Sequence, residues 1–211
     1  MQFRSKKCKF ILMIKAIIFD LGKVIVSFDF EKGFKTISQF CEFSIDDIRE
    51  KIMLSPEIRL YETGKISSQE FYNQMKKALD LTATYNQFFE AWNSIFDDET
   101  ILPESLFAEL SGKYKLVILS DTSEEHIGFL RQKLALFKHF DDFVFSYNVG
   151  EMKPSPKMFE AAVEKAKCAA NECLFVDDKL SNVLGAIECG LEAFQFLSAE
   201  QFENELKTRK L

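Results

Sequence analysis

Polar side chains of the kinds that bind metals and phosphates follow the predicted buried strands of this chain. They are Asp20, Ser120, Asp121, Lys153, Asp177 and Asp178. Because ligands of open α/β sheets bind beyond the carboxyl ends of the strands, we expect these groups to meet in one crevice. Carboxylates gathered there would repel one another unless a cation neutralised them, and hard oxygen ligands suit Mg²⁺. A lysine and a hydroxyl beside such a cation are suited to a bound phosphate.

Five short apolar runs are predicted to be the strands that position these groups. They cover residues 16–20, 116–120, 143–146, 174–177 and 193–197. Several are apolar on both faces, as a parallel sheet covered by helices requires. Helical patterns separate the later runs. One predicted helix begins at Pro156, a favourable first helical residue, and another covers residues 179–189 and ends at the C-cap Gly190. The sequence therefore predicts an α/β protein with a Rossmann-like parallel sheet core.

The gap between the first two strands is longer than one crossover needs and is predicted to be helical almost throughout. Ser67 and Glu70 form a capping box, and apolar stripes at helical spacing follow it. Aromatic stripes of this kind are packing positions rather than cofactor sites. We expect residues 30–102 to form an inserted helical-bundle cap domain, and residues 14–29 and 103–211 to form the core domain.

Composition and charge exclude several kinds of partner. The 211 residues include 33 acidic and 27 basic side chains, a net charge of −6, so binding to nucleic acid is not expected. The apolar run near the amino terminus ends at Asp20, too short for a membrane span and without a signal-peptide cleavage site. Residues 1–13 are expected to be a flexible extension, or residues 1–12 a misassigned start. Five scattered cysteines without a C-x-x-C pair suit free thiols in a reducing compartment, so we expect a cytoplasmic protein. We also expect a monomer or a weak homodimer.

Four stretches resemble the motifs of the haloacid dehalogenase (HAD) superfamily. They are FDLGKV, LSDTS, GEMKPSPKMF and FVDDKLSNVLGA, in that order. One such motif alone would be weak evidence, but four in order at suitable spacing are specific. The resemblance spans about residues 14–197 and is to the subgroup with a helical cap inserted after the first strand. The cap stretch YETGKISSQEFY and the D-L-G of the first motif are further similar to bacterial glucose-1-phosphate phosphatases.

The resemblance implies a nucleophile and a metal site. Asp20 would attack phosphorus to form an aspartyl-phosphate and would also bind Mg²⁺. The backbone carbonyl of Gly22 and the side chain of Asp178 would be the other protein ligands. Asp177 and Asn182 would support this metal site.

The resemblance also implies how a small phosphorylated metabolite is held. Ser120 would hydrogen-bond the phosphoryl oxygens, with Asp121 next to it. Lys153 would offset charge on both the nucleophile and the phosphoryl group. Further candidates for substrate binding lie in a predicted cap loop, at Arg59, Tyr61 and Glu62.

Two residues depart from the family pattern. Most family phosphatases carry an aspartate two residues after the nucleophile, a general acid and base of the kind worth about 10² to 10⁴ in rate, and here that residue is Gly22. The glucose-1-phosphate phosphatase branch shares this glycine. The branch has asparagine where this chain has Asp121, and a carboxylate there would repel phosphate unless it pointed away.

Each candidate also has an ordinary structural interpretation. Strand-end aspartates can cap helices, Ser120 can satisfy a turn, Lys153 can be solvated, and Asn182 can bond within its helix. His126 and His139 share no motif, so core or surface roles are expected for them.

Three functions remain open. They are a Mg²⁺-dependent phosphatase acting on small phosphorylated metabolites such as glucose 1-phosphate, a metal-free C–X hydrolase, and a catalytically silent binding protein. The pair Asp177 and Asp178 argues against the second function. Gly22 and Asp121 alone support the third.

Overall fold

The structure is a computed structural model that describes residues 13–211, so all but the last residue of the predicted extension lies outside the described part. The strands are β1 (Ala16–Phe19), β2 (Val26–Phe28), β3 (Phe96–Thr100), β4 (Lys115–Ser120), β5 (Asp142–Phe145), β6 (Cys173–Asp177) and β7 (Glu192–Gln195). The helices are α1 (Phe30–Ile37), α2 (Ile45–Met53), α3 (Pro56–Glu62), α4 (Ser68–Ala78), α5 (Tyr85–Asn93), α6 (Glu104–Ser111), α7 (Glu124–Lys133), α8 (Ser146–Val149), α9 (Pro156–Ala166), α10 (Leu180–Glu188) and α11 (Ala199–Arg209). Within residues 13–211, none of these helices could cross a membrane.

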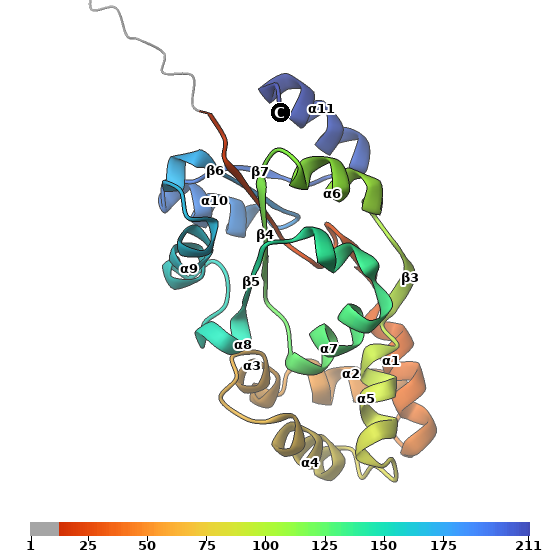
Figure 1. The fold of residues 1–211 in the computed structure, drawn as a ribbon. Coiled ribbons are helices and arrows are strands. Elements are labelled where there is room, and N and C mark those ends of the chain that lie inside the picture. Colours follow the sequence, from red (N-terminus) through yellow and green to blue (C-terminus); the bar gives the residue numbers. More distant parts are fainter. Residues whose placement is uncertain (1–12) are drawn as a thin grey trace, which may run out of the picture.

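Five parallel strands form the central sheet, in the order β5-β4-β1-β6-β7 (Figure 1). The predicted α/β sheet is therefore confirmed. Phe19 at the end of β1 lies opposite Ile118 of β4 and Val176 of β6. Because these three neighbouring strands end at nearly the same level, the residues that follow them emerge together at one edge of the sheet.

Side chains of β1 alternate between two layers of helices. Ile17 and Phe19 pack into the cluster that contains buried residues of α6, α7 and α11. Ala16 and Ile18 face the opposite cluster, which contains buried residues of α9 and α10. All four side chains are completely buried, which explains why the strand is apolar without interruption.

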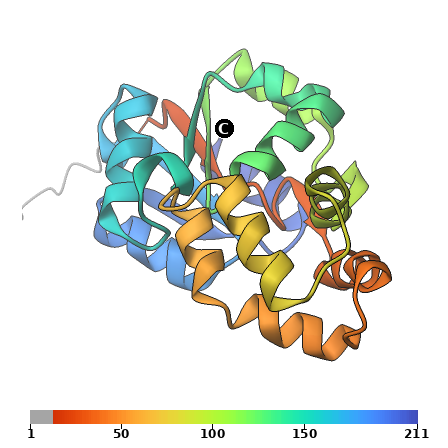
Figure 2. The same cartoon turned by 90° about the horizontal axis from the view of Figure 1, so that it is seen from below.

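Helices α1 to α5 gather at one end of the sheet (Figures 1 and 2). They share a hydrophobic cluster of their own, in which Phe71 packs against Phe88 and Trp92. The aromatic stripes are therefore packing positions, as predicted. The predicted capping box is also confirmed, because Ser67 and Glu70 bond each other's backbone N–H groups at the start of α4.

The segment before residue 102 is less helical than the sequence predicts. Residues Phe96–Thr100 form β3, which pairs antiparallel with β2 where the chain leaves and re-enters the core. β3 has the sequence FDDET, with exposed acidic residues instead of a hydrophobic alternation, so its strand character comes from pairing with β2. The boundaries of the cap domain, 30–102, stay a prediction.

Candidate active site

Asp20 follows β1 and is buried at the sheet edge. Its Oδ1 accepts a hydrogen bond from the backbone N–H of Leu21 at 2.7 Å and forms an ion pair with the ammonium of Lys153 at 2.8 Å. No donor from residues 13–211 reaches Oδ2, so this oxygen is available to a ligand. Burial raises the pKa of Asp20 to about 7; Lys153 opposes this shift and Asp177 adds to it.

Lys153 neutralises charge at the centre of the site. Its Nζ donates to the Leu119 carbonyl at 3.2 Å and to Asp177 Oδ2 at 2.7 Å, and it forms an ion pair with Asp20 Oδ1 at 2.8 Å. The ammonium therefore has three oxygen partners. Burial by itself would lower the pKa of Lys153, but Asp20, Asp177 and Asp121 hold that pKa above its ordinary value. The lysine is positively charged whenever its neighbours are ionised.

The adjacent carboxylates of Asp177 and Asp178 have different surroundings. Asp177 is fully buried, and both of its oxygens accept hydrogen bonds, from the amide of Asn182 at 3.0 Å and from Lys153 and the Lys179 N–H. Within the described residues, the Asp178 carboxylate accepts no hydrogen bond from another side chain. Burial raises its pKa and the charge of Asp177 adds to the shift. Asp177 thus anchors Lys153, while Asp178 keeps its oxygens open.

This group of carboxylates has the chemistry of a divalent-cation site. One oxygen each of Asp20, Asp177 and Asp178 lies within 4.8 Å of the others. Three carboxylates face one ammonium, that of Lys153, so negative charge is in excess. Because hard carboxylate oxygens are the ligands that Mg²⁺ prefers, the residues present fit this ion. Asp20 and Asp178 are the two with an unengaged oxygen.

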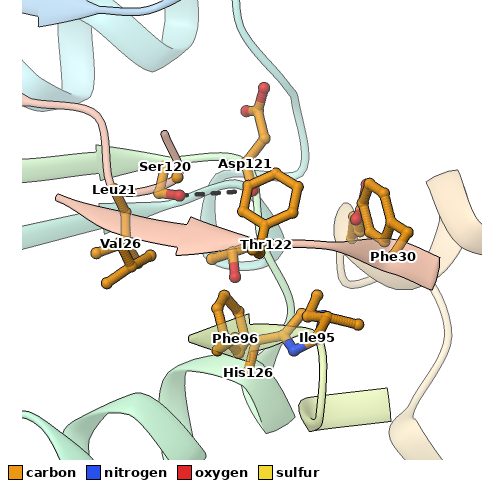
Figure 3. Close-up of a pocket in the computed structure, with 12 residues that line it drawn as sticks. Leu21, Val26, Phe30, Ile95, Phe96, Ser120, Asp121, Thr122 and His126 are labelled. Carbon is orange, nitrogen blue, oxygen red and sulfur yellow. Dashed lines mark hydrogen bonds between the residues drawn. The ribbon is translucent and has the colours of Figure 1, made fainter. Parts of the chain in front are cut away.

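A cavity of about 80 Å³ lies beside the carboxylates and is open to solvent. It is lined by Leu21, Gly22, Val26, Phe28, Phe30, Glu62, Ile95, Phe96, Ser120, Asp121, Thr122 and His126. Figure 3 shows Phe30, Ile95 and Phe96 as an apolar part of this lining, and Ser120 and Asp121 from the end of β4 as a polar part. The cavity therefore connects the carboxylates with solvent.

Asp121 links the LSDTS motif to the GEMKPSPKMF motif. Its Oδ1 accepts the backbone N–H of Lys153 at 3.0 Å, which ties the end of β4 to the loop before α9. Burial raises the pKa of Asp121, and Lys153 opposes that shift. The carboxylate therefore has a local partner, and the residue is part of the cavity lining next to Ser120.

Gly22 is covered by an aromatic ring. A Cβ atom at this position would lie 2.8 Å from Cε1 of Phe28. The Phe28 ring is itself packed edge-on against Phe30 and Phe96, with centroids at 5.1 and 6.3 Å. The space that an acid side chain at position 22 would need is therefore already filled.

Gly22→Asp by itself is expected to destabilise the fold by about 1–3 kcal/mol through overpacking, with no gain in turnover of alkyl phosphates. Adding Phe28→Ala should make room for the carboxylate, so the double variant should hydrolyse alkyl phosphates faster than Phe28→Ala alone does. Urea denaturation and steady-state rates measure both effects. A single Gly22→Asp variant that is stable and faster on alkyl esters would show that the ring does not close this position.

The three candidates from α3 take different places. Arg59 is exposed and does not line the cavity, so its role in substrate binding stays a prediction. Tyr61 is buried in the helical cluster and stacks on Phe71 at 4.4 Å. Glu62 does line the cavity.

His126 also lines the cavity, in addition to the core role expected for it. Its Nδ1 lies 2.9 Å from Oδ1 of Asn93, and its ring stacks on Trp92. Burial lowers the pKa of His126 to about 3, so the ring is neutral at ordinary pH and its Nδ1–H donates to Asn93. No motif marks His126 or the lining aromatics Phe28 and Phe96, because they come from α7, β2 and β3, which only the tertiary fold brings together.

Comparison with known proteins identifies several relatives. A family model described as haloacid dehalogenase-like hydrolase matches residues 14–190. A D-ribitol-5-phosphate phosphatase of Bacteroides thetaiotaomicron is 28% identical over 200 residues, which cover 92% of this chain and 97% of that protein. A HAD family enzyme of the same organism, crystallised in complex with magnesium and inorganic phosphate, has a TM-score of 0.80 at 26% identity and covers 91% and 98% of the two chains. L-2-haloacid dehalogenase of Xanthobacter autotrophicus shares the fold alone, with a TM-score of 0.61 at 20% identity over 93% and 83% of the chains.

Proposed function

This chain belongs to the haloacid dehalogenase-like hydrolases, and on that premise we propose that it is a Mg²⁺-dependent phosphatase of small sugar or polyol phosphates. One observation carries the proposal: Asp20, whose Oδ2 is unengaged, belongs to a cation-binding group of carboxylates next to a cavity that is open to solvent. Two relatives support the proposed phosphatase function: one is a D-ribitol-5-phosphate phosphatase, and the other was crystallised with magnesium and inorganic phosphate.

We infer the following roles for the side chains. Asp20 Oδ2 attacks phosphorus, the bond from phosphorus to the ester oxygen breaks, and the departing oxygen takes up a proton. Water then cleaves the aspartyl-phosphate and releases inorganic phosphate. Lys153 holds Asp20 Oδ1 so that Oδ2 points to the substrate, and Ser120 donates a hydrogen bond to the phosphoryl group.

Asp20, Asp178 and the Gly22 carbonyl would hold Mg²⁺, with Asp177 positioning the site through Lys153 and Asn182. When bound, this ion supplies positive charge that stabilises the phosphoryl oxygens. Glucose 1-phosphate and D-ribitol 5-phosphate are the first substrates to try. The first follows from the sequence motifs, and the second is the substrate named for the relative.

A metal-free C–X hydrolase has less support. The similarity to the dehalogenase concerns the fold alone. The open carboxylate of Asp178 next to Asp20 suits a bound cation, and metal-free hydrolysis of a C–X bond does not need one. A silent binding protein would not need the free Oδ2 of Asp20.

Asp178→Asn is expected to weaken Mg²⁺ binding by at least about tenfold, because the ion loses a charged ligand. Ser120→Ala should leave Mg²⁺ affinity nearly unchanged and raise KM for phosphate esters, since one hydrogen bond to phosphate is lost. Titration calorimetry with Mg²⁺ and steady-state kinetics separate the two effects. Equal Mg²⁺ affinities in the two variants would show that the metal site is misplaced.

A further inference from the structure

The lining of the cavity is acidic away from Lys153. Among the described residues that line it, the ionisable ones are Glu62, Asp121 and His126, and none is lysine or arginine. His126 is neutral because burial lowers its pKa to about 3. The charge that a leaving group would meet in this cavity is therefore negative.

Glu62 reaches the cavity from the end of α3, and its position is set on both sides. On one side, Tyr61 is stacked within the helical cluster. On the other side, Gly64 has a φ of 65° and packs so closely on the core that a Cβ there would lie 2.1 Å from the Tyr147 carbonyl oxygen. Only glycine fits this contact, which docks the turn after α3 onto the segment after β5.

The carboxylate of Glu62 has no hydrogen bond or ion pair within residues 13–211. Burial raises the pKa of Glu62 to about 7, the charge of Asp121 adds to the shift, and the charge of Lys179 opposes it. Holding a carboxylate partly out of water without a partner is costly, so a ligand that completes its hydrogen bonds would be bound more favourably.

We propose that Glu62, together with Asp121, makes the enzyme select phosphate esters whose leaving group is neutral and hydroxylated and reject those whose leaving group carries a negative charge. The hydroxyls donate to the Glu62 carboxylate, whereas an anionic group is repelled by both carboxylates. This inference rests on the proposed phosphatase function and adds the substrate class.

Two esters with the same carbon skeleton test it. Glycerol 3-phosphate releases a neutral triol, and 3-phosphoglycerate releases a leaving group with a carboxylate in place of one hydroxymethyl. The measured quantity is the ratio of their kcat/KM values at about pH 8, where a carboxylate with a pKa near 7 is ionised. The ratio does not depend on how much of a variant is folded.

The native enzyme is expected to favour glycerol 3-phosphate, and Glu62→Gln to reduce that preference by about tenfold, since one charge repulsion is removed. Glu90→Gln is the matched control, because Glu90 is an exposed glutamate of the cap helix α5 outside the cavity, and it should keep the native ratio. An unchanged ratio in Glu62→Gln would overturn the assignment while leaving the phosphatase function intact. Hydrolysis of neither ester, nor of glucose 1-phosphate and D-ribitol 5-phosphate, would overturn both the assignment and the phosphatase function.

Discussion

Asp20→Asn is expected to abolish hydrolysis of every phosphate ester, with a loss of at least about 10³-fold in kcat. The amide keeps the shape of the side chain but cannot attack phosphorus, and it removes one charge from the predicted Mg²⁺ site. The loss should be the same for good and poor leaving groups, because formation of the covalent intermediate is itself blocked. Steady-state rates with an aryl and an alkyl phosphate measure it.

The variant should nevertheless fold. Burial already raises the pKa of Asp20 to about 7, so an uncharged residue is tolerated there, and the melting temperature without Mg²⁺ should not fall. Asp98→Asn, at an exposed aspartate of β3, is the control and should retain full activity. Turnover in Asp20→Asn close to that of the native enzyme would contradict the assignment of the nucleophile.

Lys153→Met is expected to give the second large loss, in both activity and stability. The ammonium contacts Asp20, Asp177 and the Leu119 carbonyl, and its side chain is only 2% exposed. Removing it leaves two buried carboxylates without their cation, which costs about 3–5 kcal/mol in the free energy of unfolding. The rate should fall by at least about 10²-fold, since the charge that positions Asp20 and faces the phosphoryl group is lost.

Urea denaturation in the absence of Mg²⁺ measures the loss of stability. The double variant Lys153→Met with Asp177→Asn should recover part of the unfolding free energy but none of the activity, because it removes one of the uncompensated charges. Lys157→Met, at an exposed lysine of α9, should change neither quantity. A fully stable Lys153→Met variant would show that these ion pairs do not stabilise the core.

The central sheet and the residues at its edge were predictable because their signals are local. Apolar runs buried on both faces mark β1 and β6, and a carboxylate at the end of such a run marks the ligand-binding edge. The register of β1 with its two neighbours then brings Asp20 and Asp177 to the same level without any further information from the chain.

Features that depend on contacts distant in sequence could not be predicted. The filling of the Gly22 position by Phe28 and the docking of Gly64 on Tyr147 are tertiary contacts with no sequence pattern of their own. The pair Asp177 and Asp178 reads as two equal carboxylates, yet the turn into α10 saturates the first with donors and leaves the second open. Selection among Arg59, Tyr61 and Glu62 likewise required the direction in which each side chain leaves α3.

The aspartyl-phosphate on Asp20 is the intermediate that the proposed reaction requires. Acid quenching during turnover preserves it, and borohydride reduces a phosphorylated aspartate to homoserine while an ordinary carboxylate does not react. Peptide mass spectrometry then locates the modified residue. Without an acid side chain at position 22, water attack on the intermediate lacks a general base of the usual kind, so the phosphorylated form is expected to accumulate.

The decisive measurement is this trapping experiment on the native protein with Mg²⁺ and a phosphate ester. We expect homoserine at position 20 only when the ester is present, and none in Asp20→Asn. Steady turnover with no phosphorylated residue at any time, or with the phosphoryl group on a residue other than Asp20, would contradict the proposed reaction.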